Sequence, residues 1–301
     1  MVAINYAHQY QQALEQAWPY TLYFGDLFNT PNNQRFRWVN ARTIEIPTLE
    51  TTGRVDSNRD TIATAARNYN NAWTPLTLSN ERQWSTLVHP QDINQTNMVA
   101  TIGNITQVFN QEQKFPEMDA YCVSKIYADY TEASKTPITE EITAANILEY
   151  FDKMMINMAE ARVPSTGRIL YITPVYNAML KQAEKLARTV IIGDAENKLN
   201  RTIANLDLVK IVEVPSELMK TVYDFTQGYK PAVSAKQIKM FMVHPLAVIT
   251  PINYEFARLD EPSAMSQGKY VYYEESHEDV FILQKKIDGI QQQIEYHRFS
   301  F

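Results

Sequence analysis

The sequence predicts an α+β fold, and three features carry this prediction. Alternating apolar and polar residues predict a long β-ribbon within residues 41–92. Apolar residues at helical spacing predict helices over 116–130 and within 139–158. Strand-like runs alternate with a helix between residues 168 and 243, which is typical of a small mixed α/β unit.

Residues 1–40 are rich in aromatic and amide side chains. The spacing allows a short helix over His8 to Trp18, which should stop at Pro19. The rest shows no clear period and is predicted to be an extended segment with aromatic anchors. The anchors would lie either on another molecule or, somewhat more commonly, on the segment's own domain.

Residues 41–92 look like an arm that has no core of its own. The outgoing strand begins at Thr43, and the return runs through Trp73 and Trp84. An isolated two-stranded ribbon is at best marginally stable in water, so this ribbon needs a surface to lie on. A neighbouring subunit and the ribbon's own domain are equally good candidates for that surface.

A spine-like helix is predicted after the ribbon, from Pro116 to Tyr130, with a length of roughly 25 Å. Proline is tolerated in the first turn of a helix, where its missing N–H is not needed, so Pro116 is expected to start the helix. The next helix should open near Thr139. Its apolar stripe is predicted to pack in the core and consists of Ile147, Leu148, Phe151, Met154, Met155 and Met158.

The following segment supplies the α/β unit. Strands are predicted over 168–172, 206–214 and 239–243, and a helix is predicted to begin at Pro174. Residues 215–236 are predicted to form a long loop. The C-terminal part is predicted to be β again, over 252–259, 270–273, 279–286 and 290–296.

Composition and charge exclude several classes of function. A net charge of -6 argues against a dedicated nucleic-acid binder, which is usually basic. The 8 glycines are not clustered, so the sequence has no phosphate-binding loop and no dinucleotide fingerprint. Cys122, the single cysteine, lies among apolar residues, which predicts a buried structural thiol in a reducing compartment. The sequence shows no signal-peptide pattern and no bilayer-length apolar run, so a soluble protein without a membrane partner is expected.

Motifs for catalysis or metal binding are missing from the sequence. The histidines show no zinc-binding spacing, and no serine lies in a nucleophile elbow. His277 lies in an acidic run, which is predicted to be a solvated loop because it lacks the pattern of a calcium loop. We therefore expect no catalytic residue, no metal and no cofactor, and the protein is not expected to be an enzyme.

The order of these segments resembles the major capsid proteins of tailed bacteriophages, which have the Hong-Kong-ninety-seven-type fold. Several stretches are similar to those of siphophages of Gram-positive bacteria. They are Pro116-Glu117-Met118-Asp119-Ala120, Ala145-Asn146-Ile147-Leu148, Val163-Pro164 with Arg168-Ile169-Leu170-Tyr171-Ile172-Thr173-Pro174, and Lys286-Ile287-Asp288-Gly289-Ile290.

This resemblance implies four parts. Residues 1–40 would be an N-terminal arm and residues 41–92 an extended loop in the form of a β-hairpin. Residues 93–136 and 245–301 would form a peripheral domain with the long spine helix and long strands. Residues 137–244 would form an α/β axial domain, whose loop at 215–236 would point towards the axis of a hexamer or pentamer.

The resemblance also implies a mechanical function. Copies of the chain would assemble as hexamers and pentamers into an icosahedral shell, the virion capsid, around double-stranded DNA that is bound without sequence specificity. Assembly would take place in the host bacterial cytoplasm with a scaffolding protein and a portal protein. The residues expected to contact neighbouring subunits are Tyr23, Phe24, Trp38, Arg54, Arg59, Trp73, Trp84, Tyr223, Phe225 and Tyr229.

Two other classes stay open. An encapsulin-like nanocompartment shell shares the fold and would need a groove for cargo. An unrecognised cytosolic enzyme is the third choice, since an active site can be built from residues far apart in sequence.

Two further expectations concern assembly. A separately encoded scaffold is expected, with no cleaved N-terminal domain, because arm-like sequence begins at Tyr6. The shell is expected to be non-covalent, because an isopeptide cross-link needs a lysine on the extended loop and the first lysine is Lys114. The arginines of the arm and ribbon are expected to pair with carboxylates of neighbouring subunits.

Overall fold

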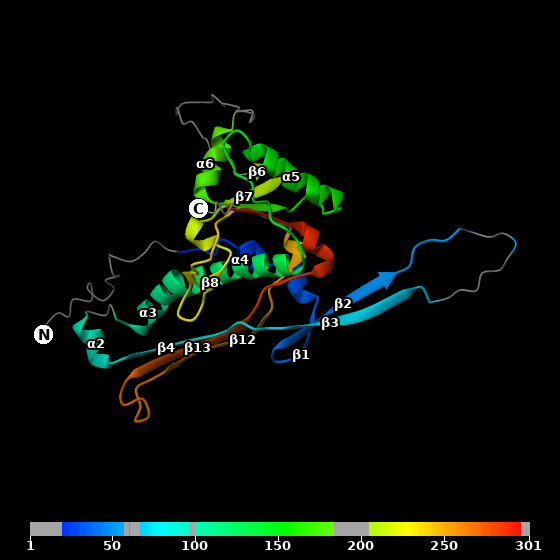
Figure 1. Cartoon of the computed structure of the whole chain (residues 1–301). Coiled ribbons are helices and arrows are strands. Elements are labelled where there is room, and N and C mark those ends of the chain that lie inside the picture. Colours follow the sequence, from blue (N-terminus) through cyan, green and yellow to red (C-terminus); the bar gives the residue numbers. More distant parts are fainter. Residues whose placement is uncertain (1–19, 57–59, 61–66, 97–99, 184–204, 296–301) are drawn as a thin grey trace, which may run out of the picture.

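The computed structural model describes residues 20–56, 60, 67–96, 100–183 and 205–295. A long central helix, α4, runs through the body of the molecule (Figure 1). A unit with its own sheet lies above this helix, a three-stranded sheet lies below it, and a ribbon projects to one side. Helices and sheets are mixed as in an α+β fold, as predicted.

The N-terminal strap, which we define as residues 20–34, packs on its own body. It contains α1 (Gly25–Phe28) and the 3-10 turn η2 (Pro31–Gln34). Phe24 and Leu27 are fully buried, and the Asn32 amide donates to the carbonyl oxygens of Leu246 and Val248. The aromatic anchors of the strap therefore lie on their own domain and not on another molecule. The helix expected over residues 8–18 lies outside the described residues.

The ribbon is present as predicted. Strands β2 (Thr43–Thr51) and β3 (Tyr69–Thr77) pair antiparallel over nine residues each, and β1 (Arg37–Asn40) adds a short third strand beside β2. The root of the ribbon packs its apolar side chains on Ile249 and Phe281 of the body. Beyond the root the ribbon extends away from the rest of the molecule (Figure 1).

The strand that carries Trp84 does not belong to the ribbon, so this part of the prediction is wrong. Strand β4 (Glu81–Val88) pairs with β13 (Tyr270–Glu278), which pairs with β12 (Ile252–Asp260) in a separate sheet. The chain leaves the ribbon at Leu78, which is buried against the body. The acidic run around His277 is accordingly part of a strand and not a loop.

The spine helix begins earlier than the sequence suggests. A short helix, α2 (Pro90–Gln95), comes first. Helix α3 (Ile102–Phe109) then continues through a π-turn (Asn110–Lys114) into α4 (Phe115–Glu132). The prediction that Pro116 starts the helix is therefore wrong. A proline inside an α-helix removes one backbone hydrogen bond and its ring crowds the preceding turn, and the wider π-turn just before Pro116 accommodates that change.

The upper unit is a five-stranded sheet in the order β15-β10-β5-β7-β6. Its strands are β5 (Ile169–Ile172), β6 (Asn205–Leu206), β7 (Val209–Glu213), β10 (Ile238–Val243) and β15 (Ile290–Ile294). Helices α5 (Ile147–Glu160) and α6 (Pro174–Gln182) cover one face, and α4 with the strap covers the other.

Most predictions for this unit are confirmed. Strands β5 and β10 and the helix start at Pro174 agree with the sequence, and the stripe from Ile147 to Met158 packs in the core. Two details differ. Helix α5 begins at Ile147 and not near Thr139, and β15, which was expected in the peripheral part, completes this sheet.

The remaining elements are short. The region 215–236 holds the 3-10 turn η4 (Ser216–Leu218) and a small hairpin of β8 (Tyr223–Asp224) and β9 (Lys230–Pro231). After β10 come the 3-10 turn η5 (Pro245–Ala247) and β11 (Val248–Ile249), which pairs with β14 (Phe281–Ile282). The strand predicted over 279–286 is thus shorter and is followed by the 3-10 turn η6 (Gln284–Gly289). Among the described residues, no helix combines the length and apolar character needed to cross a bilayer.

Candidate assembly surfaces

The ribbon exposes apolar side chains that its own chain does not cover. Leu49 is 65% exposed, Tyr69 is 55% exposed and Trp73 is 41% exposed. The Arg37 guanidinium lies 3.9 Å from the centre of the Trp73 ring, and it also pairs with Glu45 at 2.7 Å. Trp73 is therefore held in a defined position on the outside of the ribbon. Exposed and ordered apolar groups of this kind mark interaction surfaces.

The ribbon is fixed to the body at its root by a buried carboxylate, Asp279. The Ser79 backbone N–H donates to Asp279 Oδ2 at 2.8 Å, and the Ser79 hydroxyl donates to the same oxygen at 3.1 Å. The Tyr121 hydroxyl, from α4, donates to Asp279 Oδ1 at 2.8 Å. Asp279 thus joins the chain leaving the ribbon to the spine helix, so the ribbon root is rigid while its strands project.

A second buried carboxylate, Asp119 on α4, holds the strap. It accepts hydrogen bonds from the Tyr20 hydroxyl and from the backbone N–H groups of Tyr23 and Phe24. Burial raises the pKa of the Asp119 carboxyl to about 6, although these hydrogen bonds act in the opposite direction. The strap and the ribbon are therefore both attached to α4 through an aspartate.

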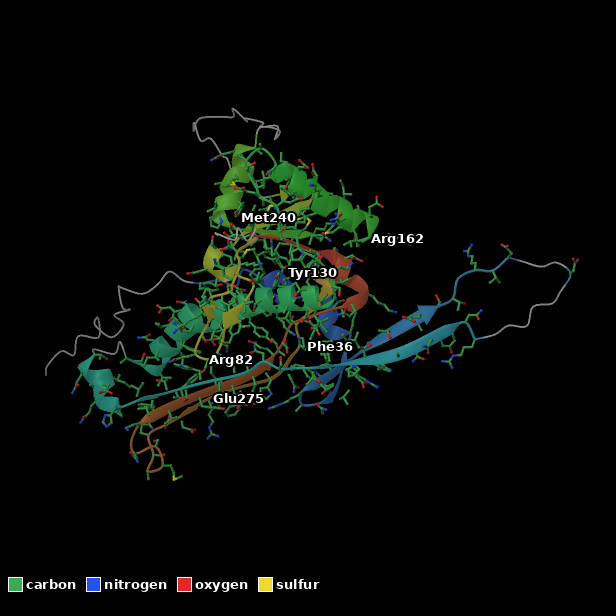
Figure 2. All side chains as sticks on the ribbon, viewed as in Figure 1. Phe36, Arg82, Tyr130, Arg162, Met240 and Glu275 are labelled. Carbon is green, nitrogen blue, oxygen red and sulfur yellow. The ribbon has the colours of Figure 1, made fainter. Side chains whose placement is uncertain are left out.

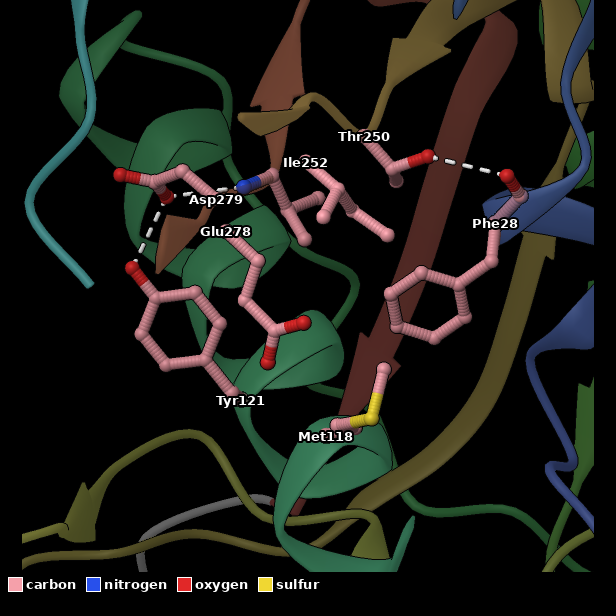
Figure 3. A pocket seen from close by; sticks show the side chains of 8 residues that line it. Phe28, Met118, Tyr121, Thr250, Ile252, Glu278 and Asp279 are labelled. Carbon is pink, nitrogen blue, oxygen red and sulfur yellow. Dashed lines mark hydrogen bonds between the residues drawn. The ribbon is translucent and has the colours of Figure 1, made fainter. Parts of the chain in front are cut away.

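A small pocket lies beside the Asp279 attachment, and Asp279 is one of the residues that line it (Figure 3). Phe28 of the strap, Met118 and Tyr121 of α4, and Ile252 of β12 line it with carbon atoms, and the side chain of Glu278 reaches into it. The pocket marks the place where strap, spine helix and lower sheet meet.

The predicted contact residues divide into three groups. Trp38, Trp73 and Arg54 are exposed on the ribbon or at its root, where a neighbour can reach them. Phe24 and Tyr223 are 0% and 7% exposed, so their prediction as contacts between subunits is wrong. Those that are partly buried against the same chain are Tyr23, Trp84, Phe225 and Tyr229. Arg59 lies outside the described residues.

The buried aromatic residues have clear partners within the chain. The Phe24 ring lies 4.4 Å from the Tyr171 ring, between α4 and the upper sheet. The Tyr223 hydroxyl donates to the Glu217 carbonyl oxygen at 2.6 Å. The Trp84 ring stacks on Phe109 of α3 at 3.9 Å. These contacts account for the sequence signal that suggested free aromatic anchors.

Several arginines form ion pairs within their own chain. Arg37 pairs with Glu45, Arg42 with Glu81, and Arg82 with Glu117. The expectation that the arm and ribbon arginines pair with carboxylates of neighbouring subunits stays a prediction for these three, because the Arg37 and Arg42 side chains are still 57% and 60% exposed. Arg54, on the exposed end of the ribbon, is still placed for such a contact.

The acidic run contributes to a cluster that the sequence alone does not reveal. His277 Nε2 lies 3.0 Å from Glu81 Oε1 and 3.1 Å from Glu275 Oε1. Arg42 pairs with Glu81, and the Tyr273 hydroxyl donates to Glu275. Both carboxylates of this cluster, Glu81 and Glu275, therefore have partners within the protein. Glu275 lies on the sheet face away from α4, and Arg82 lies on the face towards it (Figure 2).

Sequence reasoning missed Asp119 and Asp279 as organising residues. The apolar residues next to each aspartate in the sequence could have indicated that its carboxylate is buried. Asp119 stands among buried positions of a helix, next to Ala120 and Cys122, and Asp279 directly precedes the buried run that starts at Val280. A carboxylate at a buried position requires donors, but the sequence does not show which segments supply them.

Known structures resemble this chain along most of its length. No protein-family model matches it, and no curated protein sequence matches it. A structure of Mycobacterium phage Che8 shares 14% identity and a TM-score of 0.66, covering 94% of this chain and 95% of that chain. The mature capsid of bacteriophage PhiM1 shares 12% identity and a TM-score of 0.68, covering 96% and 91%.

The capsid of Cyanophage P-SCSP1u is also similar, with 10% identity, a TM-score of 0.62 and coverage of 99% of this chain and 94% of that chain. The class of fold is therefore that of viral shell proteins. More specifically, this chain has the fold of tailed-phage major capsid proteins, as the resemblance in sequence implies.

Proposed function

We propose that this protein is the major capsid protein of a tailed bacteriophage. Its copies assemble as hexamers and pentamers into an icosahedral shell that encloses double-stranded DNA. The shared fold supports this proposal because it extends over 94% of the chain or more in the similar structures described above. The protein is then a component of the virion capsid, assembled in the host bacterial cytoplasm.

The projecting ribbon is the observation that carries the proposal. It places ordered apolar side chains at a distance from any core of its own subunit. Such a ribbon is marginally stable in isolation, and packing on a neighbouring subunit supplies the missing buried surface. We place Trp38, Trp73 and Arg54 in this contact, with Arg59 as a further candidate.

The strand pairings refine the proposed parts of the subunit. We assign residues 41–78 to the extended loop, and we assign β4 with β12, β13 and the spine helix to the peripheral domain. The axial domain consists of residues 137–244 together with β15. Residues 20–40 form the described part of the N-terminal arm. The loop at 215–236 is proposed to face the axis of the hexamer or pentamer with the side that α4 does not cover.

Further partners follow from this role. A scaffolding protein directs assembly, a portal protein occupies one vertex, and DNA is enclosed without sequence-specific contacts. The net charge of -6 suits a shell that holds DNA without gripping it.

The proposal is tested by expressing the chain with and without the end of the ribbon and examining both products by negative-stain electron microscopy. The shortened variant lacks residues 52–68 and carries a two-residue Asn-Gly turn between β2 and β3. The full chain, expressed together with its scaffolding protein, should form closed shells. The shortened variant, expressed in the same way, should remain folded, by circular dichroism, as monomers or single capsomers.

Other outcomes have definite meanings. Shells that contain protein cargo and no nucleic acid, when isolated from infected cells, favour the nanocompartment. A small oligomer that never closes, from the full chain expressed with its scaffold, contradicts the capsid role. Loss of folded protein in the shortened variant shows that the ribbon belongs to the core of the subunit.

A further inference from the structure

Three side chains of the types that bind metal ions meet on the lower sheet, which consists of β4, β12 and β13. They are Glu81 on β4 and Glu275 and His277 on β13. Glu275 and His277 are two positions apart on one strand, and Glu81 pairs directly with His277 across the ladder. All three therefore lie on the same face of the sheet. Figure 2 shows that this face points away from α4.

The ligand atoms of the three side chains gather around one position. His277 Nε2 lies 3.0 Å from Glu81 Oε1 and 3.1 Å from Glu275 Oε1, and all three atoms lie within 4.8 Å of one another. Two ligands of a tetrahedral Zn²⁺ ion, each about 2.0–2.2 Å from the metal, are roughly 3.3 Å apart. Small rotations of the side chains therefore bring the three atoms to the separations found in a metal site.

Groups outside this trio hold the two carboxylates by their other oxygen atoms. The Arg42 guanidinium donates to Glu81 Oε2 at 2.5 Å, and the Tyr273 hydroxyl donates to Glu275 Oε2 at 2.7 Å. Each Oε1 atom is thereby turned towards His277. Hydrogen bonds of this kind orient the ligands of metal ions in proteins and raise the affinity of the site. Both partners can stay in place when an ion binds, because they use the Oε2 atoms.

We propose that Glu81, Glu275 and His277 form a binding site for a divalent transition-metal ion of the Zn²⁺ type. The ion takes one oxygen from each carboxylate and Nε2 of the imidazole as ligands. Water fills the fourth position, because the site lies on the outer face of the sheet and the Glu81 side chain is 46% exposed. This inference does not depend on the role of the protein in a shell.

The chemistry of the ligands decides which cation fits. An imidazole nitrogen suits Zn²⁺ and similar transition metals, whereas Mg²⁺ and Ca²⁺ favour sites that are built from oxygen atoms. The two carboxylates outweigh the single Arg42 guanidinium, so the site attracts a cation. The ion replaces the proton that His277 Nε2 can share with either carboxylate, and this proton passes to solvent.

The site lies beside the root of the ribbon. Glu81 is the first residue of β4, and the Leu78 N–H, just before it, donates to the Arg42 carbonyl oxygen at 2.7 Å. A bound ion therefore fastens the strand that leaves the ribbon to β13, the middle strand of the lower sheet. Spacing along the chain gives no sign of the site, because Glu81 meets the other two ligands only through the pairing of β4 with β13.

Calorimetric titration with Zn²⁺ tests the proposal on the unassembled full chain, prepared without a histidine tag and freed of metal by a chelator. At about pH 7.5 the chain should bind Zn²⁺ with a dissociation constant in the micromolar range or tighter. Mg²⁺ in millimolar excess should not compete. His277→Gln and Glu275→Gln each remove a ligand and should weaken binding by more than about 100-fold.

Two tyrosines provide a matched pair of variants, because they make the same contact on opposite faces of β13. The Tyr273 hydroxyl donates to Glu275 Oε2, and the Tyr272 hydroxyl donates to Glu274 Oε2, both at 2.7 Å. Tyr273→Phe should weaken Zn²⁺ binding by about 10–100-fold, since it removes a group that orients a ligand. Tyr272→Phe should leave the affinity unchanged.

Nuclear magnetic resonance of the ring nitrogens locates the ion among the 5 histidines. Zn²⁺ should shift the resonances of one histidine, and these should be missing in His277→Gln. Binding weaker than millimolar, a shift at another histidine, or equal affinities of the two tyrosine variants overturns the proposal. The cluster is then an ion-pair network that holds only a proton. If His277→Gln does not fold, the tyrosine pair still decides.

Discussion

Replacing Phe24 by alanine should strongly destabilise the folded subunit. The Phe24 side chain is fully buried, and its ring contacts Tyr171 at 4.4 Å and lies 6.4 Å from Phe241. Removing a buried phenyl ring costs about 3–5 kcal/mol, which combines lost burial with the cavity left behind. The surrounding rings belong to the sheet and cannot easily close the space, so the loss should lie towards the upper end of this range.

The assay is urea unfolding of the unassembled subunit, followed by far-ultraviolet circular dichroism. Trp38→Ala is the control, because Trp38 is 37% exposed on β1 and its loss should change the free energy of unfolding by less than about 1 kcal/mol. The reasoning is refuted if Phe24→Ala unfolds within about 1 kcal/mol of the wild type and instead prevents subunits from associating. That result would restore Phe24 as a contact between subunits.

Three further predictions concern the ribbon, the shell and the pH. Trp73→Ala should leave the subunit's unfolding midpoint nearly unchanged but reduce the yield of closed shells in micrographs, and an unchanged yield would remove Trp73 from the contact. Because the first lysine is Lys114, purified shells boiled in denaturant should run as single-chain bands on a gel, and a ladder of larger bands that resists reductant would show covalent links. The folded pKa of Asp119 lies above its ordinary value, so its contribution favours folding below about pH 4 and is lost as the pH rises through about 6. The wild type should therefore lose on the order of 2–3 kcal/mol relative to Asp119→Asn over that interval, and parallel stability curves would contradict this.

The periodicity of apolar residues was sufficient to predict individual strands and helices. The strand alternation predicted β2 and β3, and the helical spacing predicted the buried stripe of α5. The same alternation also occurs in β4, so the pattern could not separate a ribbon strand from a sheet strand. What separates them is the pairing of β4 with β13, almost two hundred positions later in the chain, which no local pattern encodes.

The failures at Pro116 and Phe24 have physical causes. A proline near a helix start and a proline after a π-turn look alike in sequence, because the π-turn is a backbone feature without a residue signature. Phe24 belongs to a segment without periodicity, and burial there comes from Tyr171 and Phe241 in the upper sheet. The aspartate attachments were equally hidden, since their donors lie far away in the chain.

Strand β15 has a consequence for how the chain is made. The upper sheet opens with β5, yet the strand that covers the edge of β10 is the last one described. While the ribosome is still synthesising the region between β10 and β15, the β10 edge has unpaired backbone groups and can pair with other nascent chains. The upper unit therefore completes its sheet only once β15 has been synthesised. Pairing between segments that are far apart in sequence forms more slowly than local pairing, so the β10 edge stays open for pairing with other chains until β15 is in place.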